Sequence, residues 1–352
     1  MHRMLRSALA LTFAVVAVAA AAQGGTGEPT VTRLDPALDA LLPADAVLDL
    51  VTGGHGFTEG VTWVQPKRGA GYLLFSDVPA NTIYRWSPET GESIHLEKSG
   101  YARPDLWRVG MEFTNGRDPA DPRFEKFPMS GSNGLALDPQ GRLLIATWAG
   151  RSIDRIGHDG KRTVLADRYQ GKRFGGTNDL TVGPDGAVYF TDTYGGMRKL
   201  DKDPSKELDT VGVFRVKDGR VTQVVDDLAA PNGLAFSPDG RYLYANGGNR
   251  RFIRRYPLHA GGTVGPGEML IDLSADKAPG ITDGMKVDTR GNLWASGPGG
   301  VWVISPEGRP LGRIRIPELV GNLAFGDRDM RTLYIAARSS IYRIRTAVPG
   351  RP

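Results

Sequence analysis

Six segments of the chain each carry one carboxylate or carboxamide side chain directly ahead of a short apolar run. These side chains are Glu59, Asn133, Asn178, Asn232, Asp283 and Asn322. All six present oxygen atoms, and no histidine or cysteine belongs to the set. Oxygen ligands that include two carboxylates suit a hard divalent cation such as Ca²⁺ and suit Zn²⁺ poorly. The residue types therefore indicate a divalent metal site, provided that the fold brings them together.

An ordinary turn is the competing explanation for each segment taken alone. Asn-Gly and Asp-Gly are common turn dipeptides, and a turn needs no ligand to account for it. Turn chemistry gives no reason for Glu59, however, and it does not explain why an oxygen-bearing side chain recurs at the same place. Convergence on one site is favoured for Glu59, Asn178, Asn232 and Asp283. For Asn133 and Asn322 the two explanations are equally good.

The segments belong to a repeat that reads as a strand, a tight turn and a second strand. In the copy from Thr177 to Asp192, apolar residues alternate with polar ones, and Pro184-Asp185-Gly186 forms the turn. Further strands lie between the copies, which gives about four strands in a period of roughly 40–55 residues. No segment shows a sustained helical period. The sequence therefore predicts an all-β fold, a six-bladed β-propeller of four-stranded blades.

A closed ring of blades would bring the equivalent point of every repeat to one mouth of a central channel. We expect the strand at Val47 to Val51 to join the last blade, because that closes the ring and removes its free edges. The predicted organisation is a signal peptide at 1–23, a polar leader at 24–46, the propeller at 47–346 and a tail at 347–352. The segment from Ser99 to Ser130 interrupts the repeat and contains aromatic residues and prolines. It is either an ordered flap or an inert loop on the surface.

Composition excludes several classes of function. The chain has 352 residues and a net charge of +5, and its arginines are spread along the sequence rather than gathered in a run. We therefore expect no nucleic-acid partner. The absence of cysteine excludes disulfides, thiolate metal sites, a cysteine nucleophile and lipid attachment at a cysteine. Without a Gly-x-Ser-x-Gly elbow or a phosphate-binding loop, serine-hydrolase and nucleotide-cleaving activities are not indicated.

The first residues read as a signal peptide. A basic start with His2, Arg3 and Arg6 precedes the apolar run Ala8 to Ala22, which is short for a membrane span and ends in small residues. A retained membrane anchor is the alternative. The sequence predicts a periplasmic or secreted protein with no membrane association after cleavage, as a monomer or weak dimer.

Four motifs together resemble the gluconolactonase/SMP-30 (regucalcin-like) family. They begin at Phe57, Asn178, Pro231 and Asp283, they stand in the family's order, and the similarity runs from about Phe57 to Arg345. The resemblance implies a six-bladed propeller with one catalytic divalent metal, commonly Ca²⁺, with Mg²⁺, Mn²⁺ or Zn²⁺ as alternatives. It also implies hydrolysis of a small-molecule sugar lactone or related ester.

The resemblance assigns roles to individual residues. Glu59, Asn232 and Asp283 match the family's metal ligands, and Asn178 matches a position that holds the metal or the substrate. A bound metal would polarise the lactone carbonyl and stabilise the oxyanion. Asp283 is our candidate for orienting or deprotonating the attacking water, with a purely ligating role as the alternative. We expect Asp179 to hold one of the metal-binding residues in position without binding the metal itself.

Three further residues are predicted to contact the substrate. Asn133 is one of the six repeated side chains. Arg173 could bind sugar hydroxyls or a carboxylate, or could be an ordinary surface arginine. Trp148 stands where many bacterial gluconolactonases carry a histidine, and it either offers a stacking face for a sugar ring or fills space. A second hypothesis, a non-catalytic propeller that binds a small ligand or protein, therefore stands beside the lactonase hypothesis.

Overall fold

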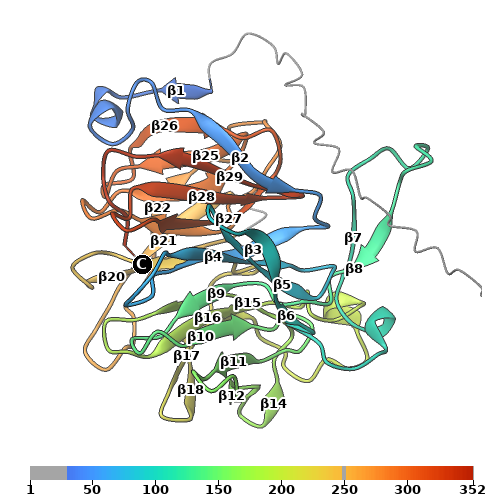
Figure 1. The fold of residues 1–352 in the computed structure, drawn as a ribbon. Helices are drawn as coiled ribbons and strands as arrows, with labels where there is room; N and C mark the ends of the chain where they lie inside the picture. The colour runs from blue at the N-terminus through green and yellow to red at the C-terminus, as the bar shows by residue number, and fades with distance from the viewer. Residues whose placement is uncertain (1–29, 248–250, 352) are drawn as a thin grey trace, which may run out of the picture.

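The computed structural model describes residues 30–247 and 251–351. The predicted signal peptide lies outside these residues. The described chain forms six antiparallel sheets of four or five strands around one axis, which confirms the six-bladed propeller (Figure 1). Its helical segments within the described ranges are three short 3-10 turns, η1 (Pro36–Ala40), η2 (Leu106–Arg108) and η3 (Leu200–Lys202). Over those ranges no helix is long and apolar enough to cross a membrane.

Each blade runs outward from an inner strand, and the blades follow one another in chain order. Blade one has β3 (Thr58–Val64), β4 (Tyr72–Asp77), β5 (Thr82–Ser87) and β6 (Gly91–Glu97), and blade two has β9 (Leu135–Leu137), β10 (Leu143–Ala146), β11 (Ile153–Ile156) and β12 (Arg162–Ala166). Blade three has β15 (Thr177–Val182), β16 (Val188–Asp192), β17 (Gly212–Lys217) and β18 (Arg220–Val225), and blade four has β19 (Leu234–Phe236), β20 (Tyr242–Asn246), β21 (Phe252–Pro257) and β22 (Glu268–Asp272). Blade five has β23 (Met285–Val287), β24 (Leu293–Gly297), β25 (Gly300–Ile304) and β26 (Pro310–Arg315), and blade six has β27 (Val320–Gly326), β28 (Thr332–Ala337), β29 (Ser340–Arg345) and β2 (Leu48–Gly53).

The ring is closed by β2. This strand pairs with β29 from Leu48↔Ile344 to Gly53↔Ser340, so the first and last parts of the propeller share one sheet, as the sequence predicted. The six inner strands contact one another in a complete cycle, β3 to β9, β15, β19, β23, β27 and back to β3. Equivalent points of the six repeats therefore meet around the axis.

Residues 31–42, within the range predicted as a polar leader, pack on blade five. The strand β1 (Val31–Arg33) pairs with β26 as a fifth strand of that blade. Leu38 and Leu42 are fully buried in the core cluster that also contains Trp294 and Leu311. Their burial removes apolar surface of blade five from water.

Large apolar side chains fill the space between neighbouring blades. Trp63 of blade one stacks on Tyr334 of blade six with ring centroids 5.5 Å apart. Phe174, Phe190 and Phe214 pack at centroid distances of 5.1–5.8 Å between blades two and three. Because a twisted four-stranded blade has apolar residues on both faces, each blade needs a neighbour on either side.

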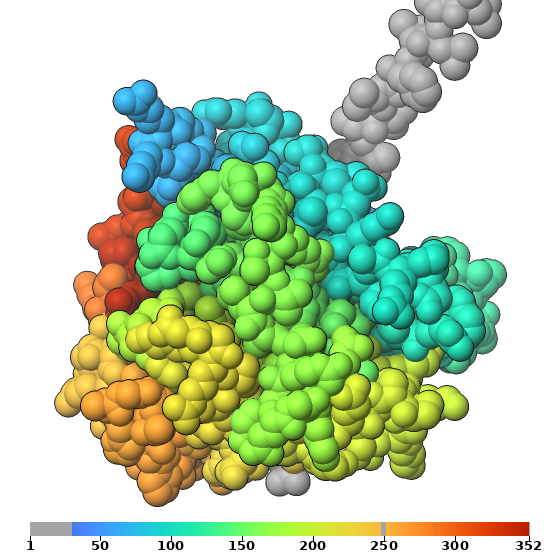
Figure 2. Space-filling view, turned by 90° about the horizontal axis from the view of Figure 1, so that it is seen from below, coloured from blue at the N-terminus to red at the C-terminus, as the bar shows by residue number. Residues whose placement is uncertain are grey.

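The segment between blades one and two is an ordered flap. It contains η2 and the hairpin of β7 (Glu112–Thr114) and β8 (Lys126–Pro128), which stands away from the ring (Figure 1). Gly110 and Met111 donate backbone hydrogen bonds of 2.9 and 2.8 Å to Gly196 and Gly195 of blade three. Figure 2 shows the flap, in cyan, against the yellow-green part of the chain at the margin of the molecule. The small hairpin of β13 (Arg168–Tyr169) and β14 (Lys172–Arg173) links blades two and three.

Candidate functional site

The six repeated polar residues lie where the inner strands begin. Glu59, Asn178 and Asn322 are within β3, β15 and β27, while Asn133, Asn232 and Asp283 stand two residues before β9, β19 and β23. All are buried except Asn232, which is partly exposed. The strand starts share one face of the ring, so the structure gathers the predicted site residues at one end of the channel.

Close approach between blades explains the glycines in these motifs. A Cβ at Gly60 would lie 1.8 Å from the backbone oxygen of Asn133, and one at Gly233 would lie 2.1 Å from that of Asp283. In the same way Gly134, Gly284 and Gly321 face Asn178, Asn322 and Glu59 of the next blade. The Asn-Gly and Asp-Gly pairs therefore meet a packing requirement at the axis. This requirement, rather than a turn, explains the glycines in these pairs.

Asp179 occupies the place that glycine holds in four other repeats. Its side chain is 2% exposed. Its Oδ1 accepts the Leu180 N–H at 2.9 Å, its own N–H donates to Thr191 Oγ1 at 3.0 Å, and its Oδ2 is buried without a protein partner. A buried carboxylate oxygen left unpaired is costly. The Oδ2 atom of this residue thus has room to accept a hydrogen bond or to bind a cation.

Three buried carboxylates repel one another at this point. Burial, together with the charge of Asp179, raises the pKa of Glu59 to about 8. Burial and the charges of Glu59 and Asp179 raise the pKa of Asp283 well above its ordinary value. Burial also raises the pKa of Asp179, against the opposing charge of Lys286. A divalent cation among these groups would favour their charged forms.

A chain of amide hydrogen bonds runs from blade three to blade five. Asn178 Nδ2 donates to Asn232 Oδ1 at 2.8 Å. The Asn232 side chain in turn hydrogen-bonds the Asp283 carboxylate, which partly offsets the rise in the pKa of that group. The amide of Asn133 is different, because its Oδ1 is buried without a protein partner. These contacts orient two amides and leave a third free to accept a hydrogen bond.

The residues fit a metal ion held by mixed ligands. Within residues 30–247 and 251–351 no three histidine, cysteine, aspartate or glutamate side chains form a metal-binding group by themselves. The ligands would therefore have to combine carboxylates with amide oxygens, a set that Ca²⁺ accepts. The unpartnered oxygens of Asp179 and Asn133, and the mutual repulsion of the carboxylates, agree with such an ion.

Polar residues on the second strands hold the motifs in place, and the sequence reasoning missed them. Ser76 Oγ donates to the backbone oxygen of Asn133 at 2.9 Å. Ser296 Oγ accepts the backbone N–H of Asp283 at 2.6 Å, and the side chain of Asn246 donates to the backbone oxygen of Asp283. With Thr191, these residues occupy equivalent positions in four of the six second strands. Aligning the second strands, as well as the first, would have revealed them.

His55 lies behind the start of β3. Its ring is 3.6 Å from Asp77 Oδ2 and 3.2 Å from Glu92 Oε2. Asp77 accepts the backbone N–H groups of Gly56 and Phe57 at 3.0 and 3.3 Å, and so fixes the segment that leads to Glu59. These contacts give His55 a structural role behind the start of β3.

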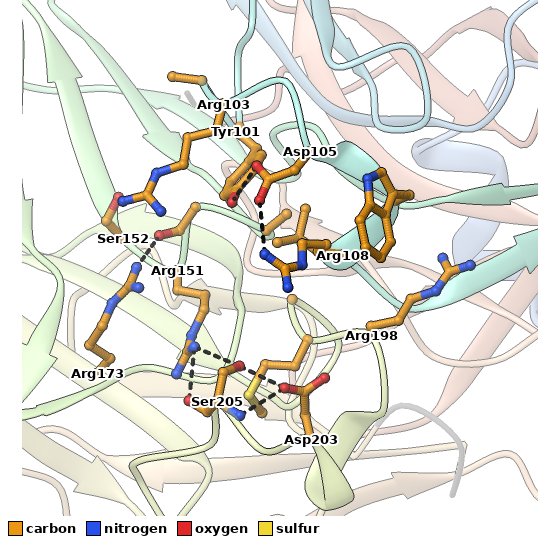
Figure 3. A pocket seen from close by; sticks show the side chains of 18 of the residues that line it. Tyr101, Arg103, Asp105, Arg108, Arg151, Ser152, Arg173, Arg198, Asp203 and Ser205 are labelled. Carbon is orange, nitrogen blue, oxygen red and sulfur yellow. Dashed lines mark hydrogen bonds and ion pairs between the residues drawn. The ribbon is translucent and has the colours of Figure 1, made fainter.

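Two of the predicted substrate residues, Trp148 and Arg173, are engaged in contacts within the protein. Trp148 is 7% exposed, and its ring packs with Phe57, Val78 and Met129 beneath the flap. This packing fits the space-filling alternative, and contact with substrate stays a prediction. Arg173 donates from Nη2 to the Gly150 oxygen at 3.0 Å and lines a separate cleft (Figure 3).

Comparison with known proteins places the chain in a family. Residues 57–339 match the SMP-30/Gluconolactonase/LRE-like region. The chain is 34% identical over 357 residues to a gluconolactonase of Zymomonas mobilis, covering 98% of this chain and 94% of that protein. It is 27% identical over 323 residues to a pentonolactonase of Haloferax volcanii, covering 84% and 92% of the two chains.

A solved structure agrees with the sequence relatives. The gluconolactonase of Xanthomonas campestris superposes with a TM-score of 0.73 at 27% identity, covering 90% of this chain and 94% of that one. The ring of strands, the axial carboxylates and these matches agree, and the chain belongs to the SMP-30/gluconolactonase/LRE-like family.

Proposed function

We propose that this protein is a metal-dependent lactonase that opens a sugar lactone at the axial site. The observation that carries the proposal is the gathering of Glu59, Asp179 and Asp283 as buried, mutually repelling carboxylates at the channel mouth. Relatives that match nearly the full chain are a gluconolactonase and a pentonolactonase, which supports an aldonolactone as substrate.

Glu59, Asn232 and Asp283 would hold the ion, for which Ca²⁺ is the proposed occupant. Such an ion supplies positive charge that polarises a lactone carbonyl. The Asn178 side chain keeps the Asn232 amide in orientation by its 2.8 Å hydrogen bond, and so acts on the ion indirectly. Ser296 and Asn246 fix the backbone of Asp283 on both sides.

Asp283 is the proposed general base. In the hydrolysis a water oxygen bonds to the carbonyl carbon, the ring C–O bond breaks, and the ring oxygen takes up a proton to give the free hydroxy acid. An ionised carboxylate beside the carbonyl carbon can accept the water proton and return it to the leaving oxygen. Asn133 Oδ1, buried without a protein partner, would accept a hydrogen bond from a sugar hydroxyl.

Export belongs to the same proposal. The basic start and the apolar run Ala8 to Ala22 support cleavage near residue 23 and a periplasmic or secreted monomer or weak dimer. N-terminal sequencing of the protein from its native host would identify the cleavage site. An intact N-terminus in the mature protein would contradict export by signal cleavage.

A panel of lactones tests the activity. Purified protein with added Ca²⁺ should hydrolyse hexono- and pentonolactones, followed by acid release at constant pH, and Glu59→Gln should lower kcat/KM by at least about 10²-fold. Glu89→Gln, an exposed change in blade one, is the matched control and should leave the rate unaltered. Binding of lactones without turnover across the panel would instead support the non-catalytic binding hypothesis.

A further inference from the structure

A cleft opens on the same face as the axial site. It has a volume of about 1160 Å³ and lies between the flap (100–109), the turn after β10 (149–152) and the loop after β16 (196–205). In an antiparallel blade, the connection from second to third strand and the connection into the next blade lie on one face. The cleft is therefore on the channel-mouth face, over blades two and three, and none of the axial residues lines it.

The cleft is strongly basic. Its lining contains three acidic residues (Asp105, Asp154 and Asp203) and seven basic ones: Arg103, Arg108, Arg151, Arg162, Arg173, Arg198 and Lys199. Figure 3 shows the guanidinium groups of Arg103, Arg108, Arg151 and Arg173 around one space.

The three carboxylates offset only part of the charge of the seven basic residues. Asp154 forms a salt bridge with Arg162, with 2.5 Å between Oδ2 and Nε. Asp203 accepts hydrogen bonds from Ser205 and from the Lys199 N–H. Asp105 accepts a hydrogen bond from Tyr101 and lies 3.9 Å from Nη1 of Arg108. Among the described residues Arg103, Arg151 and Arg173 form no salt bridge, so none of the three is bound directly to a carboxylate.

One of these arginines is held ready by the protein. Arg151 is 5% exposed, its Nε donates to the Phe174 oxygen and its Nη1 donates to the Ser205 oxygen at 3.1 Å. Its Nη2 is buried without a protein partner, and so is Nη1 of Arg198. Buried guanidinium N–H groups without acceptors are costly, and an oxyanion in the cleft would supply the acceptors.

An aromatic surface stands beside the charge. Trp107 lines the cleft and is 69% exposed, which is unusual for a side chain of this size, and Arg108 lies 5.2 Å from its ring centroid. An exposed indole face packs well against the apolar face of a sugar ring, because it buries apolar area on both partners. The combination of an indole with guanidinium groups is suited to a ring that carries a negative charge.

We propose that this cleft binds an anionic saccharide, with a pyranose ring on Trp107 and its carboxylate or sulfate held by Arg103, Arg108, Arg151 and Arg173. The site does not depend on lactone hydrolysis, because its lining residues are separate from the axial ones. A sugar acid and a sulfated sugar share the required chemistry, and titration with each separates the two sources.

Titration calorimetry on the full chain tests the site. A trisaccharide of galacturonic acid should bind at least about tenfold more tightly than a neutral trisaccharide of the same length, and added salt should weaken it. A sulfated trisaccharide is the second arm. Equal affinity for the neutral and charged sugars would overturn the proposal, as would inorganic sulfate binding as tightly as the sugars, which would indicate an adventitious ion only.

Surface variants make the test specific. Trp107→Ala and the double variant Arg103→Gln, Arg108→Gln should each lower the affinity at least about tenfold, and the sugar should quench tryptophan fluorescence only when Trp107 is present. Arg123→Gln, an exposed change in the flap outside the cleft, is the control. Variants that unfold at the wild-type temperature yet bind the charged sugar normally would contradict the proposal.

Discussion

Asn178 of blade three donates a 2.8 Å hydrogen bond from its Nδ2 to Oδ1 of Asn232 of blade four. Asn232 in turn hydrogen-bonds Asp283 of blade five. Three consecutive blades are thus joined at the axis through side chains that come from residues far apart in the sequence. Because Asn178 fixes the orientation of the Asn232 amide, a substitution at Asn178 should also change the surroundings of Asp283.

Removing the first member of this chain should weaken cation binding. In Asn178→Ala the Asn232 amide loses its partner and is free to turn, so we expect Ca²⁺ affinity to fall about tenfold, in the range of changes to residues that orient a ligand. Calorimetric titration with Ca²⁺ measures this. Asn115→Ala, in the flap, is the control, and equal affinity of the Asn178→Ala variant and wild type would show that Asn178 does not orient Asn232.

Asp179→Asn should stabilise the metal-free protein. The substitution keeps the shape of the side chain and removes a carboxylate whose charged form burial disfavours. We expect the thermal midpoint in chelator to rise by a few degrees, on the order of 1 kcal/mol. The gain in midpoint on adding Ca²⁺ should shrink at the same time. A lower midpoint with chelator would mean that the attraction to Lys286 outweighs the cost of burying the Asp179 charge.

Gly233→Ala should destabilise the ring. Its Cβ would meet the Asp283 oxygen at 2.1 Å, so the two blades would have to separate at the axis, at a cost of about 1–3 kcal/mol. Gly53→Ala, where the nearest atom to a Cβ is the Ser340 hydroxyl at 3.2 Å, is the matched control and should change stability by less than about 0.5 kcal/mol. Urea unfolding of both variants gives the comparison. Similar losses in the two would rule out close approach as the special role of Gly233.

His55 should make stability depend on pH. Burial lowers its pKa, but hydrogen bonds and charges from Asp77 and Glu92 outweigh burial and raise it overall. A histidine whose pKa is higher in the folded state than in the unfolded state stabilises the protein fully at pH values below its unfolded-state pKa. This contribution disappears as the pH rises through the folded-state pKa. The free energy of unfolding should therefore fall by about 1 kcal/mol from pH 6 to pH 9, relative to His55→Gln.

Urea titrations at several pH values, with His158→Gln as the control on an exposed turn, follow this difference. A constant difference between wild type and His55→Gln across that range would show that the imidazole is not held charged by its two carboxylates.

The repeated blades were the part of the fold that could be predicted from the sequence. Alternation in each hairpin and the placement of Val47 to Val51 predicted the blades and their closure, because both depend on local pattern and on the need to cover a sheet edge. Residues 31–42 were harder to predict. Leu38 and Leu42 lie in a short segment that carries no copy of the repeat, and they pack against the neighbouring blade five.

The candidate site shows the same division. Glu59, Asn178 and Asp283 could be found because they recur at one register of a repeat. The basic cleft could not, because Arg103, Arg151 and Arg198 come from three separate segments and meet only through the folding of the flap. Arginines that look evenly spread along the sequence can still form one surface.

The most direct test of the account is lactone hydrolysis by wild type and by Asp283→Asn, each freed of metal with chelator and then titrated with Ca²⁺. Wild type should lose its activity in chelator and regain it in proportion to the Ca²⁺ bound. The variant should stay at least about 10²-fold slower in kcat even when calorimetry shows that Ca²⁺ is bound. Full activity in chelator, or an Asp283→Asn enzyme as fast as wild type, would contradict a metal-dependent lactonase that uses Asp283 as its base.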